Sequence, residues 1–222
     1  YVNDAFSASH RNHASITGVT KFLPSFAGLA LSNEVYNLNK LLVNPIRPAA
    51  AIVGGSKIST KISLLNNIIK KFDTVIIGGA MANTFLLAKH YNIGKSLIER
   101  NLVNEATVIL EKSIKFGSKI ILPTDVVCAD NLDNPKNINL VQVENINNNQ
   151  MVLDIGDDTI QLIQLYLQDT KMILWNGPLG AFEYTPFDKS SIKIAKIIKR
   201  ISKSGISTIA GGGDTISVIK MA

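Results

Sequence analysis

The chain has 222 residues, a hydrophobic content of 46% and a mean hydropathy of +0.19, which suit a well-filled core and exclude an intrinsically disordered chain. No apolar run approaches the roughly 20 residues that a membrane-spanning helix needs, and the amino terminus has no signal-peptide pattern. The net charge of +6 suits nucleic acid or a phosphorylated small molecule, but the lysines lack interleaved aromatic residues, so we expect a local phosphate site and no nucleic-acid partner.

Residues 1–26 form a polar, turn-rich segment with little periodicity, which contains His10-Arg11-Asn12-His13. The two histidines could ligate a metal, but no third ligand is near in the sequence, so we favour hydrogen-bonded loop histidines. Arg11 is of more interest, because a guanidinium group on a loop suits bidentate binding of phosphate or carboxylate.

A connecting helix is expected over residues 27–42, where apolar residues recur at helical spacing. It should end before Asn44-Pro45, because the residue before a proline leaves the α region. The chain opens inside a strand-like run and closes inside a helix without a stop signal, so we expect a piece of a longer protein.

The stretch from Ala49 to Lys61 carries the strongest local signal. An apolar run ends at Gly54-Gly55 and a helical pattern begins just beyond, which predicts a buried strand, a tight turn and a helix. The glycines let the backbone approach a ligand, and the first N–H groups of the helix favour an anion. Lys57 and Lys61 are four residues apart and would stand on one helix face beside that anion. For this stretch alone, a turn with two solvated lysines is the alternative.

Three further apolar strands run into glycine-rich turns. Because the carboxyl ends of parallel strands share the edge of a sheet where ligands bind, we expect all four turns to converge there. The additional strands and turns are Val75-Ile76-Ile77 with Gly78-Gly79, Ile173-Leu174-Trp175 with Asn176-Gly177-Pro178-Leu179-Gly180, and Thr208-Ile209-Ala210 with Gly211-Gly212-Gly213-Asp214-Thr215.

The remaining patterns alternate between helix and strand, which indicates parallel βαβ units in a three-layer α/β domain. Two short strands at 126–129 and 140–143 predict an antiparallel excursion on the otherwise parallel sheet. Cys128, the only cysteine, lies in the first of these and is expected to be a buried, inert thiol. The other expected strands are 74–77, 119–122, 151–154, 172–175 and 207–210, and the expected helices are 80–89, 104–116, 158–167 and 189–203.

Two acidic residues follow the glycine turns. Asp214 could simply cap the next helix, or it could hold Mg²⁺ on the phosphates of a nucleotide, since Mg²⁺ prefers one or two carboxylates with phosphate oxygens. Glu183 could accept hydrogen bonds from a ribose or be an ordinary surface acid. Neither the P-loop motif nor Gly-x-Gly-x-x-Gly occurs. Glycine turns, two lysines and an aspartate suit phosphoryl transfer, where catalysis is mostly positioning and charge neutralisation.

Five motifs in order resemble those of the phosphoglycerate kinase family, and the resemblance covers the whole chain. They are Asn3-Asp4-Ala5-Phe6 with His10-Arg11-Asn12-His13, Gly54-Gly55-Ser56-Lys57 through Lys61, Ile76-Ile77-Gly78-Gly79-Ala80-Met81-Ala82, Trp175-Asn176-Gly177-Pro178-Leu179-Gly180 through Glu183, and Gly211-Gly212-Gly213-Asp214-Thr215. The resemblance implies two hinged Rossmann-like domains. The carboxyl-terminal domain would bind MgATP or MgADP, and the amino-terminal domain would bind 3-phosphoglycerate or 1,3-bisphosphoglycerate.

The resemblance also implies roles for single residues. Lys57, Lys61 and Gly213 would be catalytic, Asp214 would hold Mg²⁺, and Arg11 with His10 would bind the phosphate end of the substrate. The implied nucleotide site comprises Gly55, Ser56, Lys57, Lys61, Gly79, Ala80, Leu153, Asn176, Pro178, Glu183, Gly212, Gly213, Asp214 and Thr215, of which Gly79, Ala80, Leu153 and Pro178 would line the adenosine pocket and Glu183 would meet the ribose.

These inferences predict a three-layer Rossmann-like α/β domain with a mainly parallel sheet, together with a fragment of a second α/β domain. Residues 1–26 would be a remnant of the amino-terminal domain, 27–45 the connecting helix, and 46–222 the nucleotide-binding domain, truncated at its carboxyl end. The implied function is reversible phosphoryl transfer between 1,3-bisphosphoglycerate and ADP in glycolysis, by a cytoplasmic monomer without a membrane partner. A non-catalytic nucleotide-binding module is the alternative, since this much of the family's sequence alone would have little kinase activity.

Overall fold

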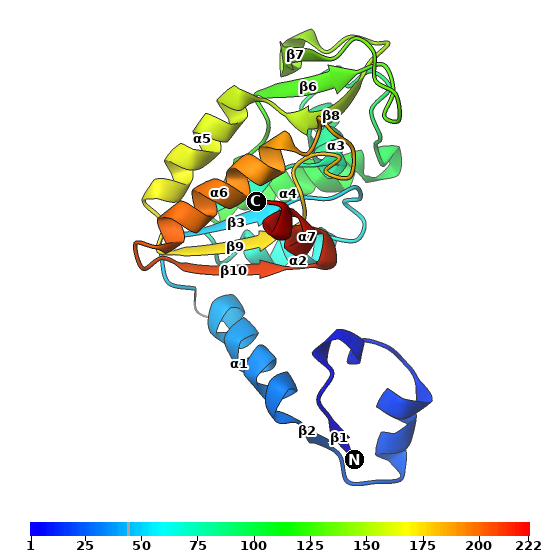
Figure 1. Ribbon diagram of the computed structural model, residues 1–222, viewed down its shortest axis with the longest axis vertical. Helices are drawn as coiled ribbons and strands as arrows, with labels where there is room; N and C mark the ends of the chain where they lie inside the picture. Colours follow the sequence, from blue (N-terminus) through cyan, green and yellow to red (C-terminus); the bar gives the residue numbers. More distant parts are fainter. Residues whose placement is uncertain (44) are drawn as a thin grey trace. The chain divides into compact units, whose positions relative to one another are not determined.

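The computed structural model describes residues 1–43 and 45–222, and the chain divides into two compact units, Tyr1–Pro45 and Ile46–Ala222 (Figure 1). The expected helix end at Asn44 lies outside the described residues, as do the side chains of residues 40–42. None of the described helices has both the length and the apolar character that crossing a membrane requires.

The first unit contains a small parallel sheet and one long helix. Strand β1 (Val2–Asn3) pairs with β2 (Phe26–Ala27), and α1 (Leu29–Val43) follows. The helix begins two residues later than predicted, because Asp4 supplies its cap from a distance: Asp4 Oδ1 accepts the N–H of Leu31 at 2.9 Å. Three short helical turns lie between the strands, at Phe6–Ala8, Ala14–Gly18 and Val19–Lys21.

The second unit is built on a five-stranded parallel sheet in the order β10-β9-β3-β4-β5. Because helices cover both of its faces, β3 and β4 are buried along their whole length, which explains why their sequences are continuous apolar runs. The strands are β3 (Ala49–Val53), β4 (Thr74–Ile77), β5 (Lys119–Ile121), β9 (Met172–Asn176) and β10 (Ser207–Gly211).

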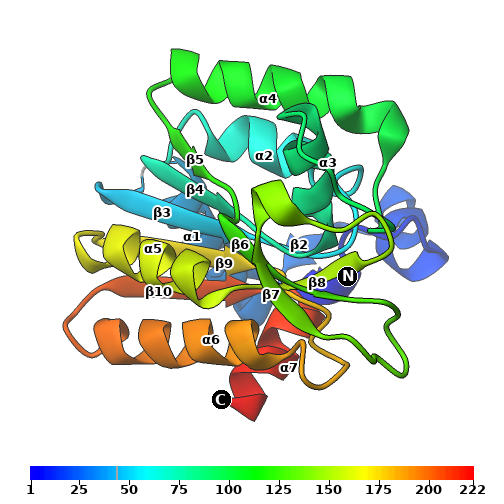
Figure 2. The ribbon, with the colours of Figure 1, turned by 90° about the horizontal axis from the view of Figure 1, so that it is seen from above.

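Figure 2 shows the helices on the two faces of this sheet. On one face lie α2 (Ile62–Ile68), α3 (Ala80–Ala88) and α4 (Val103–Lys115), and on the other lie α5 (Asp157–Gln168), α6 (Lys189–Ser202) and α7 (Gly213–Met221). Helix α4 ends just before Gly117, which has a φ of 72° and donates its N–H to Ile114 O at 3.1 Å. The three-layer α/β prediction is confirmed.

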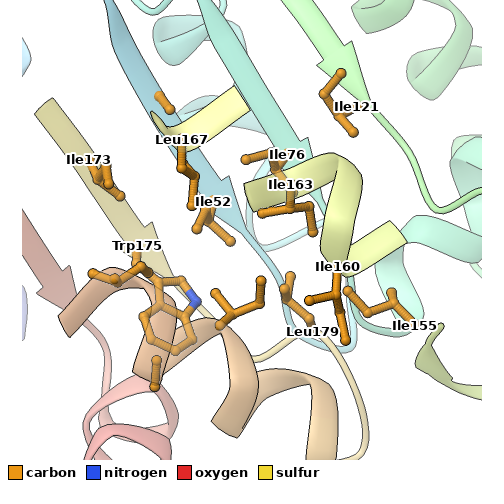
Figure 3. Packing of buried hydrophobic residues seen from close by; sticks show 14 of the residues in the cluster. Ile52, Ile76, Ile121, Ile155, Ile160, Ile163, Leu167, Ile173, Trp175 and Leu179 are labelled. Atoms are coloured by element: carbon orange, nitrogen blue, oxygen red, sulfur yellow. The ribbon is translucent and has the colours of Figure 1, made fainter. Parts of the chain in front are cut away.

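The main core lies between the sheet and the helices α5 and α6 (Figure 3). Alternate residues of the strands, such as Ile52 and Ile76, meet Ile163 and Leu167 from α5. Each such side chain contributes about 1.5–3 kcal/mol on burial. Trp175 closes the core at the carboxyl end of β9, where its indole N–H donates to Gly177 O at 2.8 Å. The core therefore holds the ends of the strands, and the turns beyond them, in fixed positions.

The antiparallel strands form a sheet of their own and do not extend the parallel sheet as predicted. Its order is β7 (Asn139–Gln142), β6 (Asp125–Ala129), β8 (Met151–Ile155). The reason is a second small core, in which Val126 and Cys128 pack with Leu86 of α3, so that β6 packs on this helix and does not pair with β5. Burial raises the pKa of Cys128 to about 11, as expected for an inert thiol.

Candidate functional site

Four glycine-containing turns meet at the carboxyl edge of the parallel sheet, as the sequence predicted. Their backbones are hydrogen-bonded to one another: Gly54 N–H donates to Asn176 O at 3.0 Å, and Gly55 N–H donates to Pro178 O at 3.0 Å. Gly79 N–H donates to Leu179 O at 2.9 Å. The turns after β3, β4 and β9 therefore form one connected backbone structure.

This structure leaves no room for a side chain at the point where the turns after β3 and β9 cross. A Cβ atom on Gly54 would lie 2.0 Å from Pro178 O, and a Cβ atom on Gly177 would lie 2.3 Å from Gly54 O. Both contacts are with backbone carbonyl oxygens, and Pro178 O is fixed by the hydrogen bond from Gly55 N–H. The glycines are thus needed here for close approach of two chain segments.

A cavity of about 400 Å³ lies beside these turns, within the size range of small-molecule sites. Its wall is mostly apolar, and it is built by α3, β8, the segment after α3 and the loop that follows β9. Eight residues that the sequence placed in the nucleotide site line this one cavity: Gly55, Ser56, Gly79, Ala80, Leu153, Pro178, Glu183 and Asp214.

The side chain of Asn176 connects Lys61, which follows β3, to Gly211 at the end of β10. Its side-chain oxygen accepts a hydrogen bond from Lys61 Nζ, and its side-chain nitrogen donates to Gly211 O at 3.0 Å. One carboxamide at the end of β9 thereby fixes the direction of an ammonium group that comes from a different part of the chain.

Lys61 and Asp214 are close enough to interact electrostatically. Partial burial lowers the pKa of Lys61, and the negative charge of Asp214 opposes that shift. An ammonium group that is half desolvated exerts a stronger field on a nearby anion than an exposed one. A positive group, a carboxylate and the cavity therefore lie close to one another.

The lysines do not share a helix face, and this prediction was wrong. Helix α2 begins only at Ile62, and residues 56–61, which we call the lysine turn, precede it. Within the turn, Thr60 Oγ1 donates to Lys57 O at 2.9 Å and Lys61 N–H donates to Ile58 O at 2.8 Å. Ile58 is fully buried, and its packing in the core holds the turn in place. Burial of Ile58 overrides the helical periodicity that the sequence showed.

The turn after β10 uses a different design. Gly212 has a φ of 96°, a conformation that favours glycine, and α7 begins at the next residue. The first N–H groups of α7 have no intrahelical partners, and Gly213 and Asp214 are exposed there. Thr215 is fully buried, and its hydroxyl accepts the N–H of Gly177 at 2.7 Å, which binds this turn to the one after β9.

The comparisons identify the family. A model of the family described as Phosphoglycerate kinase matches residues 1–222. The chain belongs to the phosphoglycerate kinase family. Two relatives named phosphoglycerate kinase, from Granulibacter bethesdensis and Maricaulis maris, are each 46% identical over 223 residues, which is 100% of this chain and 56% and 55% of theirs.

Solved structures of the family agree. Phosphoglycerate kinase from Coxiella burnetii matches with a TM-score of 0.89 and 38% identity over 99% of this chain and 56% of that chain. The enzyme from Pyrococcus horikoshii matches with a TM-score of 0.82 and 26% identity over 99% of this chain and 55% of that chain. The chain thus spans about half the length of the phosphoglycerate kinases that it matches.

Some predicted residues lie outside the wall of the cavity. Lys57, Lys61 and Asn176 lie on or beside the lysine turn; Gly212 lies in the turn after β10, and Gly213 and Thr215 lie at the start of α7. Arg11 and His10 are exposed residues of the first unit. In residues 1–43 and 45–222, no group of three or more His, Cys, Asp or Glu side chains could by itself hold a metal ion.

Sequence reasoning missed several residues of the cavity wall. Asn83 lies one helical turn beyond Ala80, so its spacing on α3 could have revealed it. Lys95 and Leu97 belong to an irregular segment after α3, which carries no motif. Nor did any local signal mark Asp154, which lies at the end of β8.

Asp154 is a buried carboxylate in the wall of the cavity. Burial raises its pKa to about 7, although hydrogen bonds from Ser190 and Ile155 act in the opposite direction, and the nearby charge of Asp188 adds to the increase. Ser190 N–H donates to Oδ2 at 3.1 Å and Ile155 N–H to Oδ1 at 2.9 Å. The bond from Ser190 attaches the start of α6 to the end of β8.

Proposed function

We propose that the chain forms the nucleotide-binding part of a phosphoglycerate kinase, which transfers a phosphoryl group reversibly between 1,3-bisphosphoglycerate and ADP. The observation that carries this proposal is the convergence of the cavity, the hydrogen bond from Lys61 to Asn176, and Asp214 at one edge of the sheet. Apolar walls for a base and opposite charges for a metal-bound polyphosphate are thereby adjacent.

The adenosine of the nucleotide would occupy the cavity. Gly79 and Ala80 offer flat backbone surface at the start of α3, and Leu153 and Pro178 offer apolar surface on the other walls. Glu183 is exposed at the cavity, where its carboxylate can accept hydrogen bonds from the ribose hydroxyls. This division into an apolar slot and one polar acceptor is typical of nucleoside sites.

The phosphates would lie between the lysine turn and the start of α7. Lys57 and Lys61, with the N–H group of Ser56, would face them from one side, and the N–H groups of Gly212, Gly213, Asp214 and Thr215 from the other. Asn176 keeps the Lys61 ammonium group in position. Phosphoryl transfer needs little more than such positioning and stabilisation of the developing charge.

The residues present fit a bound Mg²⁺ ion. Asp214 contributes a single carboxylate at the cavity, and Mg²⁺ is commonly held by one or two carboxylates with phosphate oxygens completing its shell. When bound with the nucleotide, the ion neutralises phosphate charge. The role of Asp214 is to hold it, and the charge of Lys61 acts on the same phosphates.

In this proposal, the first unit belongs to the domain that binds 3-phosphoglycerate or 1,3-bisphosphoglycerate. Residues 1–26 would be a part of that domain, 27–45 the connecting helix and 46–222 the nucleotide-binding domain. Arg11 and His10 are exposed in this unit and can meet the phosphate end of the substrate by charge-assisted hydrogen bonds. The active enzyme would be a monomer that acts on small molecules.

Calorimetric titration of the 222-residue chain with ADP, in the presence and absence of Mg²⁺, tests the binding site. We expect weak binding that Mg²⁺ strengthens, and we expect Asp214→Asn to abolish the Mg²⁺ effect. Equal binding of ADP in both conditions would contradict the role of Asp214. A coupled assay separates the enzyme from a non-catalytic nucleotide-binding module: the full-length gene product should turn over, and the 222-residue chain should have little or no activity.

A further inference from the structure

Residues 95–99, which we call the bridging segment, connect the cavity to the lysine turn. Two of its residues, Lys95 and Leu97, line the cavity. The next turns of the chain lead into α4, so the segment runs along the surface between two helices that cover the same face of the sheet. The backbone of the segment is irregular, so it can hold other residues in place only if hydrogen bonds attach it to helices or strands.

The bridging segment is attached to rigid elements at both ends. At its start, Lys95 N–H donates to Gln150 O at 2.8 Å, and Ser96 Oγ accepts the N–H of Val152 in β8 at 2.9 Å. At its end, Glu99 N–H donates to the hydroxyl of Thr84 in α3 at 3.2 Å.

The middle of the segment is held in the same way, since Asn83 Nδ2 of α3 donates to Leu97 O at 3.2 Å. Asn83 and Thr84 are 1% exposed, so the anchors on α3 belong to the core and not to the mobile surface. The segment is therefore a fixed wall of the cavity.

From this wall, the Glu99 side chain reaches the lysine turn. Its Oε2 accepts the backbone N–H of Ser59 at 3.0 Å, in the middle of the turn that carries Lys57 and Lys61. Although partial burial acts to raise it, hydrogen bonds from Ser59 and Ile58 and the charge of Lys57 hold the pKa of Glu99 below its ordinary value. The carboxylate is thus ionised at neutral pH. It accepts a backbone N–H of the lysine turn, which precedes the first residue of α2.

We propose that Glu99 is a positioning residue for the phosphate-binding lysines, because its carboxylate fixes the lysine turn to the wall of the adenosine cavity. The inference rests on the proposed function and assigns it a further residue. Glu99 does not line the cavity; it acts through Ser59 on the turn between Lys57 and Lys61. Loss of the carboxylate should weaken binding of the phosphates and leave binding of the nucleoside alone.

The test compares MgADP with adenosine, titrated calorimetrically into the 222-residue chain and three variants. Glu99→Ala removes the acceptor, Glu99→Gln keeps an oxygen that can accept the Ser59 N–H, and Glu111→Ala removes an exposed acid from the middle of α4 as a control. We expect Glu99→Ala to weaken MgADP binding about tenfold, as loss of one hydrogen bond to a charged group would. Adenosine affinity should stay within about twofold, and Glu99→Gln should recover most of the MgADP affinity.

The possible failures are distinguishable. If the unaltered chain bound no MgADP, the proposed function would fall and the inference with it. If the unaltered chain bound MgADP and Glu99→Ala bound it equally well, only the inference would be overturned. Equal weakening of MgADP and adenosine in Glu99→Ala, or a Glu99→Gln variant as weak as Glu99→Ala for MgADP, would also overturn it, because either result would show a general role in folding of the site.

Discussion

The two turns that face each other across the proposed phosphate site differ in how they present positive charge. After β3, six residues intervene between Gly55 and the first residue of α2, and the turn presents the ammonium groups of Lys57 and Lys61. After β10, α7 begins two residues past Gly211, and the turn presents backbone N–H groups. One turn therefore uses side chains that can move, and the other uses a backbone that cannot.

This difference matters for a reaction in which the charge on a phosphoryl group shifts. Backbone N–H groups at a helix start hold an anion in a fixed place, whereas an ammonium group on a flexible side chain can follow the group that is transferred. Lys61 is the intermediate case, because Asn176 restrains it from the β9 side. The comparison predicts that chemistry depends most on the lysine turn, and that binding and stability depend most on the turn after β10.

The largest effect is expected for Lys61. In the full-length protein, Lys61→Ala should lower kcat by about 10²-fold or more, as loss of a charge-stabilising donor typically does. Steady-state kinetics measure this effect, and Lys196→Ala, an exposed lysine of α6, is the matched control. An unchanged kcat in Lys61→Ala would show that Lys61 has no catalytic role. It would also contradict the prediction that chemistry depends most on the lysine turn.

Substitutions of Gly212 and Gly213, after β10, should affect stability and ligand binding separately. Gly212→Ala forces a φ of 96° on a residue with a side chain and should lower the free energy of unfolding by about 1–3 kcal/mol. Gly213→Ala meets open space and should keep full stability, but its methyl group would stand where the phosphates approach and weaken MgADP binding. Urea denaturation and calorimetry measure the two effects, and equal stability of both variants would be the contrary result.

The hydrogen bond between the turn after β9 and the start of α7 gives an effect on stability of similar size. Thr215→Val keeps the shape of a buried residue but leaves the N–H of Gly177 without the acceptor that it now has at 2.7 Å. The free energy of unfolding should fall by about 1–3 kcal/mol. Ser217→Ala on the exposed side of α7 is the control and should change it by less than about 0.5 kcal/mol. A Thr215→Val variant of unchanged stability would mean that the turn after β9 and the start of α7 do not depend on each other.

The raised pKa of Asp154 should make the stability of the folded chain depend on pH, apart from any titration of the lysine turn. Its pKa of about 7 in the folded chain exceeds its ordinary value of 3.8, so between these values the folded state binds a proton that the unfolded state does not. Stability should therefore fall as the pH rises from about 4 to about 7, by at most about 1.4 kcal/mol for each pH unit. Asp154→Asn should remove this slope, as urea denaturation at several pH values can measure. A slope equal to that of the unaltered chain would assign it to another group.

The sequence predicted most of the fold, because four of the five strands of the parallel sheet are apolar runs that end at glycine-rich turns, and both features are visible in the composition. It also predicted residues that now line one cavity, such as Ala80 and Leu153, through the family resemblance. The start of α2 could not be predicted from the sequence. Ile58 fits the helical pattern, but it lies in the turn before α2 and is buried there. The bridging segment was equally hidden, because its place is set by hydrogen bonds to α3 and β8 that leave no trace in composition.

The close crossing of the turns at Gly54 and Gly177 limits how this site could be redesigned. A library that varied this crossing would mostly yield chains that cannot fold the two turns together, because any side chain there meets a carbonyl group. For the proposed nucleotide, changes of base preference are instead open to engineering at the part of the cavity wall that Lys95, Leu97 and Leu153 form. Directed evolution of a new nucleotide preference should therefore accumulate its substitutions on that wall and leave the glycines untouched.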